Sequence, residues 1–149
     1  MKTMYSQPKQ QPPYVCAILL CPHSRTLLVE QRPSKPDLPA SGMITCFGGK
    51  VEQGEHPETA LYRELREELG GWQPGHMART VDLFVDGKLI AYFYLGNAPD
   101  RTIKLTFEQG RTGLWFTLGE LLLDHRLSGW HASALRAWSA GESRADFSS

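Results

Sequence analysis

The sequence lacks net charge, a run of basic residues and any paired cysteine motif. Sixteen Lys and Arg residues balance sixteen Asp and Glu residues, and the basic residues do not cluster. Because binding to a nucleic acid backbone needs concentrated positive charge, a nucleic acid polymer is not the expected partner. The three cysteines show no CxxC spacing, which argues against a disulfide framework and a zinc knuckle. We therefore expect a small-molecule partner and a reducing compartment.

Long apolar segments are also missing. The longest early apolar run, residues 15–21, is too short to span a membrane and lacks a small-residue cleavage site of the signal-peptide type. We therefore expect a cytoplasmic protein with no membrane partner. The length of 149 residues suits one domain. We place this domain at residues 14–140, between a Gln/Pro-rich flexible leader (1–13) and a frayed C-terminal tail (141–149).

The pattern within the domain alternates strand and helix signals. Apolar runs separated by turn residues predict strands, Asp86-Gly87 favours a tight hairpin turn, and Thr117 with Glu120 has the spacing of a helix capping box. Ser128 is a candidate cap for a last helix. We expect a loop at 33–42 and strands at 15–20, 27–31, 43–47, 80–85 and 88–95, with weaker ones at 103–106 and 114–116. This order predicts a mixed sheet with helices on its faces.

Residues 48–71, GGKVEQGEHPETALYRELREELGG, concentrate negative charge on one predicted helix. Pro57 suits the first turn and the glycines at 70–71 suit the end, so we expect a helix over residues 57–69. Glu64, Glu67 and Glu68 would share one face of it. Like charges at this spacing repel by roughly 0.2–0.5 kcal/mol per pair. The cluster is either a solvated helix face or a cation-binding site.

The spacing of the whole segment resembles the Nudix box, the signature of the Nudix hydrolases. The matching letters are Gly49, Glu55, Arg63, Glu64, Leu65, Glu67, Glu68 and Gly70, whereas Gly71 stands where the family prefers an apolar residue. The resemblance implies an α/β fold, an α/β/α sandwich with a mixed central sheet. The order of the expected strands and helices fits this family along residues 14–140. Only the box itself is a specific match.

The resemblance also implies a metal site. Magnesium takes oxygen ligands, which carboxylates and a backbone carbonyl supply. By position in the family, Glu64, Glu67, Glu68 and the carbonyl of Gly49 would hold Mg²⁺ or Mn²⁺. Arg63 and Glu55 would pair beside them and orient the helix carboxylates. The general base would be either Glu64 or Glu108, the latter lying shortly before Trp115 in FEQGRTGLWF.

The implied reaction is hydrolysis of a nucleoside diphosphate linked to another group X. Gly48 would let a diphosphate approach the backbone. Arg32 and Lys50 are candidate phosphate contacts, although either also fits a surface charge. Four aromatic residues are candidates for stacking on a base, and each also fits a core position. They are Tyr14, Phe47, Trp115 and Trp130.

Two positions bear on the substrate by comparison with family subgroups. Asp86 stands where ADP-ribose hydrolases tend to carry Pro, and Lys88 where diadenosine polyphosphate hydrolases tend to carry Tyr. The FGGKVE wording resembles the branch that destroys oxidised nucleoside triphosphates. We therefore expect a (deoxy)nucleoside triphosphate pyrophosphohydrolase, with oxidised nucleotides such as 8-oxo-dGTP among its substrates, acting as a monomer or homodimer.

Other readings of the same box stay open. A nucleotide-sugar or ADP-ribose pyrophosphatase and a non-catalytic ligand-binding module of the same fold are the alternatives. The isomerase of isopentenyl diphosphate shares the fold, but its box is degenerate where this one is intact.

Overall fold

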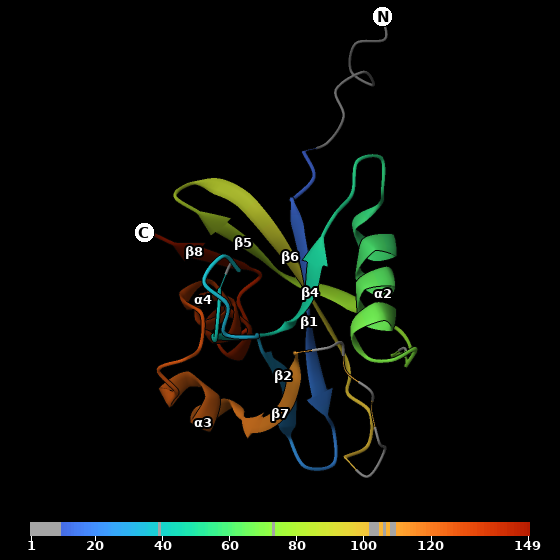
Figure 1. The fold of residues 1–149 in the computed structure, drawn as a ribbon. Coiled ribbons are helices and arrows are strands. Elements are labelled where there is room, and N and C mark those ends of the chain that lie inside the picture. Colours follow the sequence, from blue (N-terminus) through green and yellow to red (C-terminus); the bar gives the residue numbers. More distant parts are fainter. Residues whose placement is uncertain (1–9, 39, 73, 102–104, 106, 108–109) are drawn as a thin grey trace, which may run out of the picture.

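The computed structural model (Figure 1) describes residues 10–38, 40–72, 74–101, 105, 107 and 110–149. Strands lie before and after a central helix, as the sequence predicts, and two further helices and a last strand follow. The elements are β1 (Tyr14–Cys21), β2 (Thr26–Gln31), β3 (Ile44–Thr45), β4 (Phe47–Lys50), α2 (Pro57–Glu68), β5 (Ala78–Val85), β6 (Lys88–Asn97), β7 (Thr112–Thr117), α3 (Leu118–Leu123), α4 (Gly129–Ser139) and β8 (Arg144–Phe147).

The strands form one mixed sheet with the order β3-β2-β1-β6-β5-β8. The β1–β6 and β5–β8 pairs are parallel, and the other pairs are antiparallel. Strand β1 forks on one side: its first half pairs with β4 and its second half with β2. Strand β7 pairs with β2 along all six of its residues. The fork brings the glycine-bearing strand β4 next to the centre of the sheet.

Helices cover both faces of the sheet, with α2 on one side and α3 and α4 on the other (Figure 1). Alternate residues of β1 divide between the two cores: Val15, Ala17 and Leu19 pack under α2, while Cys16 and Ile18 pack on the α4 side. This period of two is what a strand buried on both faces requires. The predicted α/β/α sandwich with a mixed sheet is confirmed.

Helix α2 begins and ends close to where its sequence signals predict. Pro57 occupies the first turn, and Gly70 and Gly71 follow the helix with positive φ angles of 62° and 91°. Leu61 and Leu65 are fully buried on the face that meets the sheet. Burying each leucine contributes roughly 1.5–3 kcal/mol, which outweighs the repulsion among the glutamates of the same helix.

Two local predictions are confirmed in the geometry. Asp86 and Gly87 both have positive φ, 49° and 83°, as a type I′ hairpin turn between β5 and β6 requires. Thr117 accepts a hydrogen bond from the backbone N–H of Glu120, whose carboxylate accepts one from the N–H of Thr117, completing the capping box of α3. Ser128 does stand at the N-cap of α4, but its side chain makes no capping hydrogen bond.

Three expectations need correction or lie outside the described residues. The single strand expected at 43–47 is divided into β3 and β4. Residues 144–147, expected in a frayed tail, form β8, because the backbone pairs with β5 through Asp82 N to Ser143 O (2.9 Å) and Asp86 N to Phe147 O (2.9 Å). Of the strand expected at 103–106, only Leu105 is described, and it lies in neither helix nor strand; the leader residues 1–9 lie outside the described residues. The leader's described part, 10–13, contains neither helix nor strand.

None of the helices in the described ranges is both long enough and apolar enough to cross a membrane.

Candidate metal and phosphate site

The site is built where β4 runs beside α2. A Cβ on Gly48, whose φ is +154°, would lie 2.1 Å from the carbonyl oxygen of Val15. A Cβ on Gly49 would lie 2.3 Å from the carboxylate carbon of Glu64. Side chains at these two positions would therefore collide with β1 or with the helix carboxylates. The glycines let α2 bring its glutamates directly against the backbone of β4.

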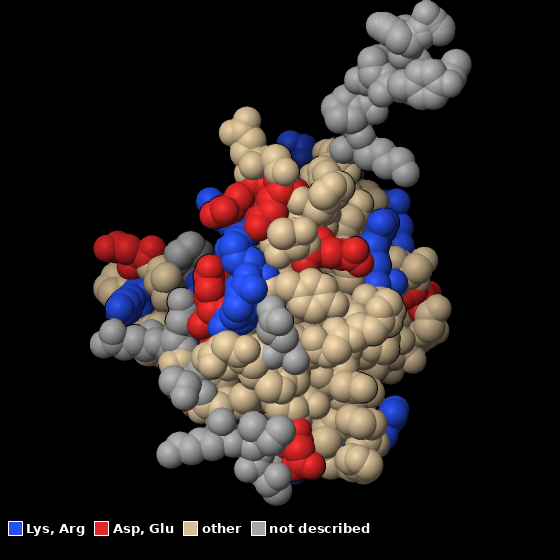
Figure 2. All heavy atoms as spheres, turned by 90° about the vertical axis from the view of Figure 1, so that its right-hand side faces the viewer, with Lys and Arg blue, Asp and Glu red and all other residues tan. Residues whose placement is uncertain are grey.

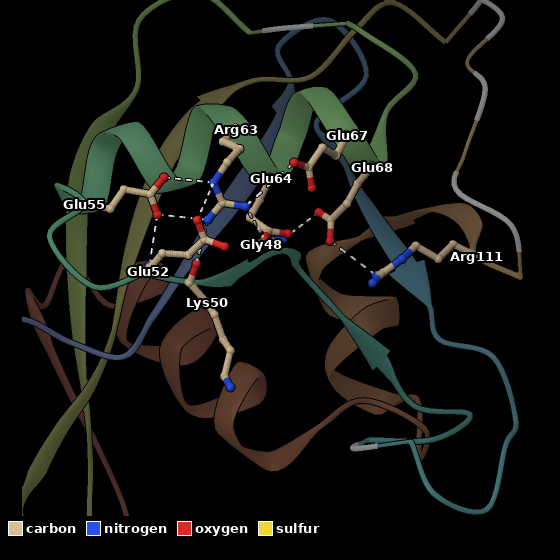
Figure 3. Close-up of polar contacts among 9 residues, drawn as sticks. All are labelled: Gly48, Lys50, Glu52, Glu55, Arg63, Glu64, Glu67, Glu68 and Arg111. Atoms are coloured by element: carbon tan, nitrogen blue, oxygen red, sulfur yellow. Dashed lines mark hydrogen bonds and ion pairs between the residues drawn. The ribbon is translucent and has the colours of Figure 1, made fainter.

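Glu68 is the most deeply buried of the helix carboxylates, with 1% of its surface exposed. The backbone N–H of Gly48 donates to its Oε1 at 3.0 Å (Figure 3). Its Oε2 is buried, and no described group donates a hydrogen bond to it. Burial, reinforced by the neighbouring carboxylate of Glu30, raises the pKa of Glu68 to about 9. A buried carboxylate oxygen to which no described group donates a hydrogen bond can act as a ligand to a cation.

Arg63 organises the other end of the box. Its guanidinium donates to both carboxylate oxygens of Glu55 at 2.8 and 2.9 Å, to the carbonyl of Lys50 at 3.0 Å, and to Oε1 of Glu64 at 2.9 Å (Figure 3). Hydrogen bonds from Arg63 lower the pKa of Glu55 to about 2. The predicted pairing of Arg63 with Glu55 is formed, and it orients the carboxylate of Glu64.

Glu67 is the most open of the three glutamates, since 52% of its side chain is exposed and it lies 3.8 Å from Arg63 Nη1. The three carboxylates are thus close in sequence but differ in their contacts. Within the described ranges, no three His, Cys, Asp or Glu side chains converge closely enough to form a ready-made metal site. Arg63 holds Glu64, and Gly48 and Arg111 contact Glu68. A cation would therefore draw the carboxylates together from these contacts.

The donor set nevertheless fits a hard divalent cation. It consists of carboxylate oxygens on one helix, and one of them is buried and accepts no hydrogen bond from the described residues. Beside them runs strand β4, whose glycines allow its backbone to approach the helix closely. Glu64, Glu67 and Glu68 would supply side-chain oxygens to such a cation, and Gly49 a carbonyl oxygen.

Two charged residues at this site, Glu30 and Arg111, are not predicted from the sequence. Glu30 of β2 has 1% of its side chain exposed, and the Nη1 of Arg111 lies 2.5 and 2.6 Å from its carboxylate oxygens. The same Nη1 lies 3.3 Å from Oε2 of Glu68. Thr45 also donates to Glu30, at 3.4 Å. The available signal was an acidic residue inside the apolar strand TLLVEQ, because a buried charge must have a partner.

The predicted substrate contacts fall in different places. Arg32 lies 3.9 Å from Glu30, and its Nε is buried with no acceptor among the described residues. Lys50 is exposed, and its side chain extends away from the helix carboxylates (Figure 3). Arg32 therefore lies beside the site, whereas Lys50 extends from its edge.

The aromatic candidates lie mainly in the cores. Phe47 is fully buried under α2 and stacked on Phe107, so we do not retain it as a substrate contact. Trp115 is partly buried under the same helix, with the Arg101 guanidinium 5.4 Å from its ring. Tyr14 and Trp130 pack edge to face on the α4 side. Glu108, the alternative base, lies outside the described residues.

Charges of both signs are interspersed on the face that α2 covers (Figure 2). Acidic and basic groups adjoin one another on part of this face, much of the rest is uncharged, and the view contains no single broad basic surface.

Comparison with known proteins places this chain in a family. The NUDIX domain matches residues 10–138 of the chain. The CTP pyrophosphohydrolase of Escherichia coli (strain K12) is 33% identical over 97 residues, which cover 64% of this chain and 70% of that protein. The 8-oxo-dGTP diphosphatase of Proteus vulgaris is 39% identical over 57 residues, 38% of this chain and about half (49%) of that protein.

Solved structures agree in fold. The crystal structure of a MutT NUDIX hydrolase from Burkholderia pseudomallei matches with a TM-score of 0.65 and 27% identity, covering 85% of this chain and 98% of that one. The solution structure of the ORF135 protein of E. coli matches with a TM-score of 0.59 and 30% identity, covering 85% and 87%.

Proposed function

The chain belongs to the Nudix family, and from this premise we propose that it is a divalent-metal-dependent hydrolase of nucleoside diphosphates linked to a group X. The proposed preferred substrates are (deoxy)nucleoside triphosphates, oxidised forms such as 8-oxo-dGTP included. One observation carries the proposal: the Oε2 of Glu68 is buried beside the glycines of β4, and no residue that the structure describes donates a hydrogen bond to it. Such an oxygen is expensive to bury unless a cation binds it.

The proposed roles follow from the contacts. Glu64, Glu67, Glu68 and the carbonyl of Gly49 hold Mg²⁺ or Mn²⁺. The bound ion supplies neutralisation of phosphate oxygens and a lowered pKa for a coordinated water. Arg63, fixed on both oxygens of Glu55, keeps Glu64 oriented.

The general base remains one of two glutamates, Glu64 or Glu108. Arg63 donates to Glu64 at 2.9 Å, so proton abstraction by Glu64 requires release of that hydrogen bond or use of its other oxygen. A pH–rate profile of Glu64→Gln and Glu108→Gln separates them, because loss of the base removes the acidic limb of the profile.

The choice of substrate is supported by the names of the relatives. Both matched proteins are named for nucleoside triphosphates or their oxidised form, in agreement with the residues at positions 86 and 88. Arg32, beside Glu30 at the end of β2, is the phosphate contact that we retain. Nucleotide sugars and ADP-ribose are the alternative substrates, which would make the protein a nucleotide-sugar or ADP-ribose pyrophosphatase.

The test is a turnover screen with product masses recorded. Nucleoside and deoxynucleoside triphosphates, their 8-oxo forms, CTP, ADP-ribose, nucleotide sugars and diadenosine tetraphosphate are each offered with Mg²⁺, with Mn²⁺ and with excess chelator. We expect pyrophosphate and a nucleoside monophosphate from triphosphates, and none in chelator. Full activity in chelator refutes the metal mechanism. ADP-ribose turning over with a kcat/KM about tenfold above every triphosphate refutes the choice of substrate.

A further inference from the structure

Arg111 joins two buried carboxylates that come from different elements. It lies immediately before β7, whose register against β2 places Thr112 opposite Gln31 and Gly113 opposite Glu30. This pairing delivers the guanidinium to Glu30, although the two residues are 81 positions apart. From there it also reaches Glu68 of α2 (Figure 3).

The two contacts of Arg111 differ in strength. Its Nη1 lies 2.5 and 2.6 Å from the oxygens of Glu30, within hydrogen-bond range of both. The same nitrogen is 3.3 Å from Oε2 of Glu68, and no hydrogen bond forms there. Charge-assisted hydrogen bonds fall at about 2.7–2.9 Å, so Glu30 holds the guanidinium and Glu68 is only approached by it. Arg111 is therefore anchored on one carboxylate and close to the other.

This arrangement has a consequence for charge. Glu30 and Glu68 are each 1% exposed, and each would carry a negative charge into the protein interior. In the absence of a metal ion, Arg111 places one positive charge beside both carboxylates, which together can carry two negative charges. A divalent cation at Oε2 of Glu68 would meet the guanidinium at that oxygen, and like charges this close repel.

We propose that Arg111, anchored by Glu30, is a positioning residue that pairs with Glu68 in the metal-free protein. When a divalent cation binds Oε2 of Glu68, it displaces the guanidinium from that oxygen. Arg111 thereby stabilises the metal-free protein and lowers its affinity for the cation. The inference rests on the proposed function in one respect, the role of Glu68 as a metal ligand.

The test is a direct binding titration that does not depend on turnover. Mn²⁺ binding is followed by electron paramagnetic resonance and Mg²⁺ binding by calorimetry. For Arg111→Met we expect a Kd for the cation about tenfold lower than that of wild type, a change of the size typical of coupling between two interacting sites. In chelator its Tm should fall by several degrees, and saturating Mg²⁺ should restore most of the loss, because the unpaired carboxylates then have a cation.

A second variant keeps the test decisive if Arg111→Met does not fold. Glu30→Gln combined with Arg111→Met removes the anchored pair and leaves the net charge of the protein unchanged. A tighter Kd in this double variant cannot come from net charge, so it isolates the competition at Glu68. Arg111→Lys retains the positive charge and should return the Kd to within about threefold of wild type.

The matched control is Arg126→Met, which also breaks an Arg–carboxylate pair, to Asp124 at 2.7 Å. Its Kd should equal that of wild type. If the double variant binds Mn²⁺ with the wild-type Kd, the inference about Arg111 is wrong.

Failure of the proposed function gives a different result in the same titration. If Glu68→Gln does not weaken Mn²⁺ binding, Glu68 is not a metal ligand. If Glu68→Gln weakens binding while Arg111→Met and the double variant with Glu30→Gln leave it unchanged, only the role of Arg111 is refuted.

Discussion

Replacing Glu68 by Gln is the most direct test of why this protein places three glutamates on one helix. The change keeps the size of the side chain, and the amide oxygen can still accept the 3.0 Å hydrogen bond from Gly48 N. It removes the buried negative charge that we assign to the metal. Loss of one well-placed electrostatic contact typically lowers kcat about 10²–10³-fold, or roughly 2.7–4 kcal/mol in barrier.

Folding should survive the same substitution. Burial raises the pKa of Glu68 to about 9, so the fold disfavours a negative charge at this position in the metal-free protein. A neutral amide should therefore leave the metal-free protein at least as stable as wild type.

The assay pairs kcat at saturating Mg²⁺ with thermal unfolding in chelator. Glu58→Gln is the matched control, because Glu58 is exposed in the first turn of the same helix, and its rate should change by less than about threefold, or about 0.7 kcal/mol. Wild-type kcat in Glu68→Gln would refute the catalytic assignment. Unfolding of Glu68→Gln in chelator would instead identify Glu68 as a structural anchor.

Three further predictions concern the same site. Gly49→Ala should fold but lose at least about tenfold in kcat/KM, because its Cβ would displace the flexible Glu64 carboxylate 2.3 Å away. Gly75→Ala, with no atom within 4 Å of its Cβ, is the control, and equal rates would contradict the steric argument. Arg63→Lys keeps the positive charge but loses the paired guanidinium hydrogen bonds to Glu55. Activity should therefore fall about 10–100-fold, with unchanged helicity by circular dichroism. Finally, the pKa of Glu68 rises from 4.5 to about 9 on folding, so the stability it contributes is present below pH 4.5 and is lost as pH rises towards 9. In chelator, the Tm of wild type minus that of Glu68→Gln should therefore decrease from pH 6 to pH 9, and a flat difference would refute the shift.

The sequence predicts well those features of the fold that depend on residues close together in the chain. The Asp86-Gly87 turn, the Thr117–Glu120 capping box and the ends of α2 each depend on residues a few positions apart. The resemblance of residues 48–71 to the Nudix box then led to the site, where Arg63 and Glu55 pair as expected.

Features that depend on distant pairing could not be predicted in the same way. Strand β8 has the charged sequence RADF, and only its ladder with β5 makes it a strand. The role of Arg111 cannot be predicted from the sequence, because its partner Glu30 is 81 positions away. The sequence makes Phe47 a candidate substrate contact, because its place before two glycines does not reveal which face of the sheet it occupies; the structure buries it under α2.

The fork in β1 divides the sheet into parts that should open independently. Strand β4 pairs with Tyr14 to Ala17 of β1 and, among the described strands, with no second partner. Strand β1 has a further neighbour, β6, along its other side. Native-state hydrogen exchange should therefore find the amides of β1 among the slowest in the protein. The N–H of Gly48, which holds Glu68, should exchange through a smaller opening that leaves the β1–β6 ladder intact.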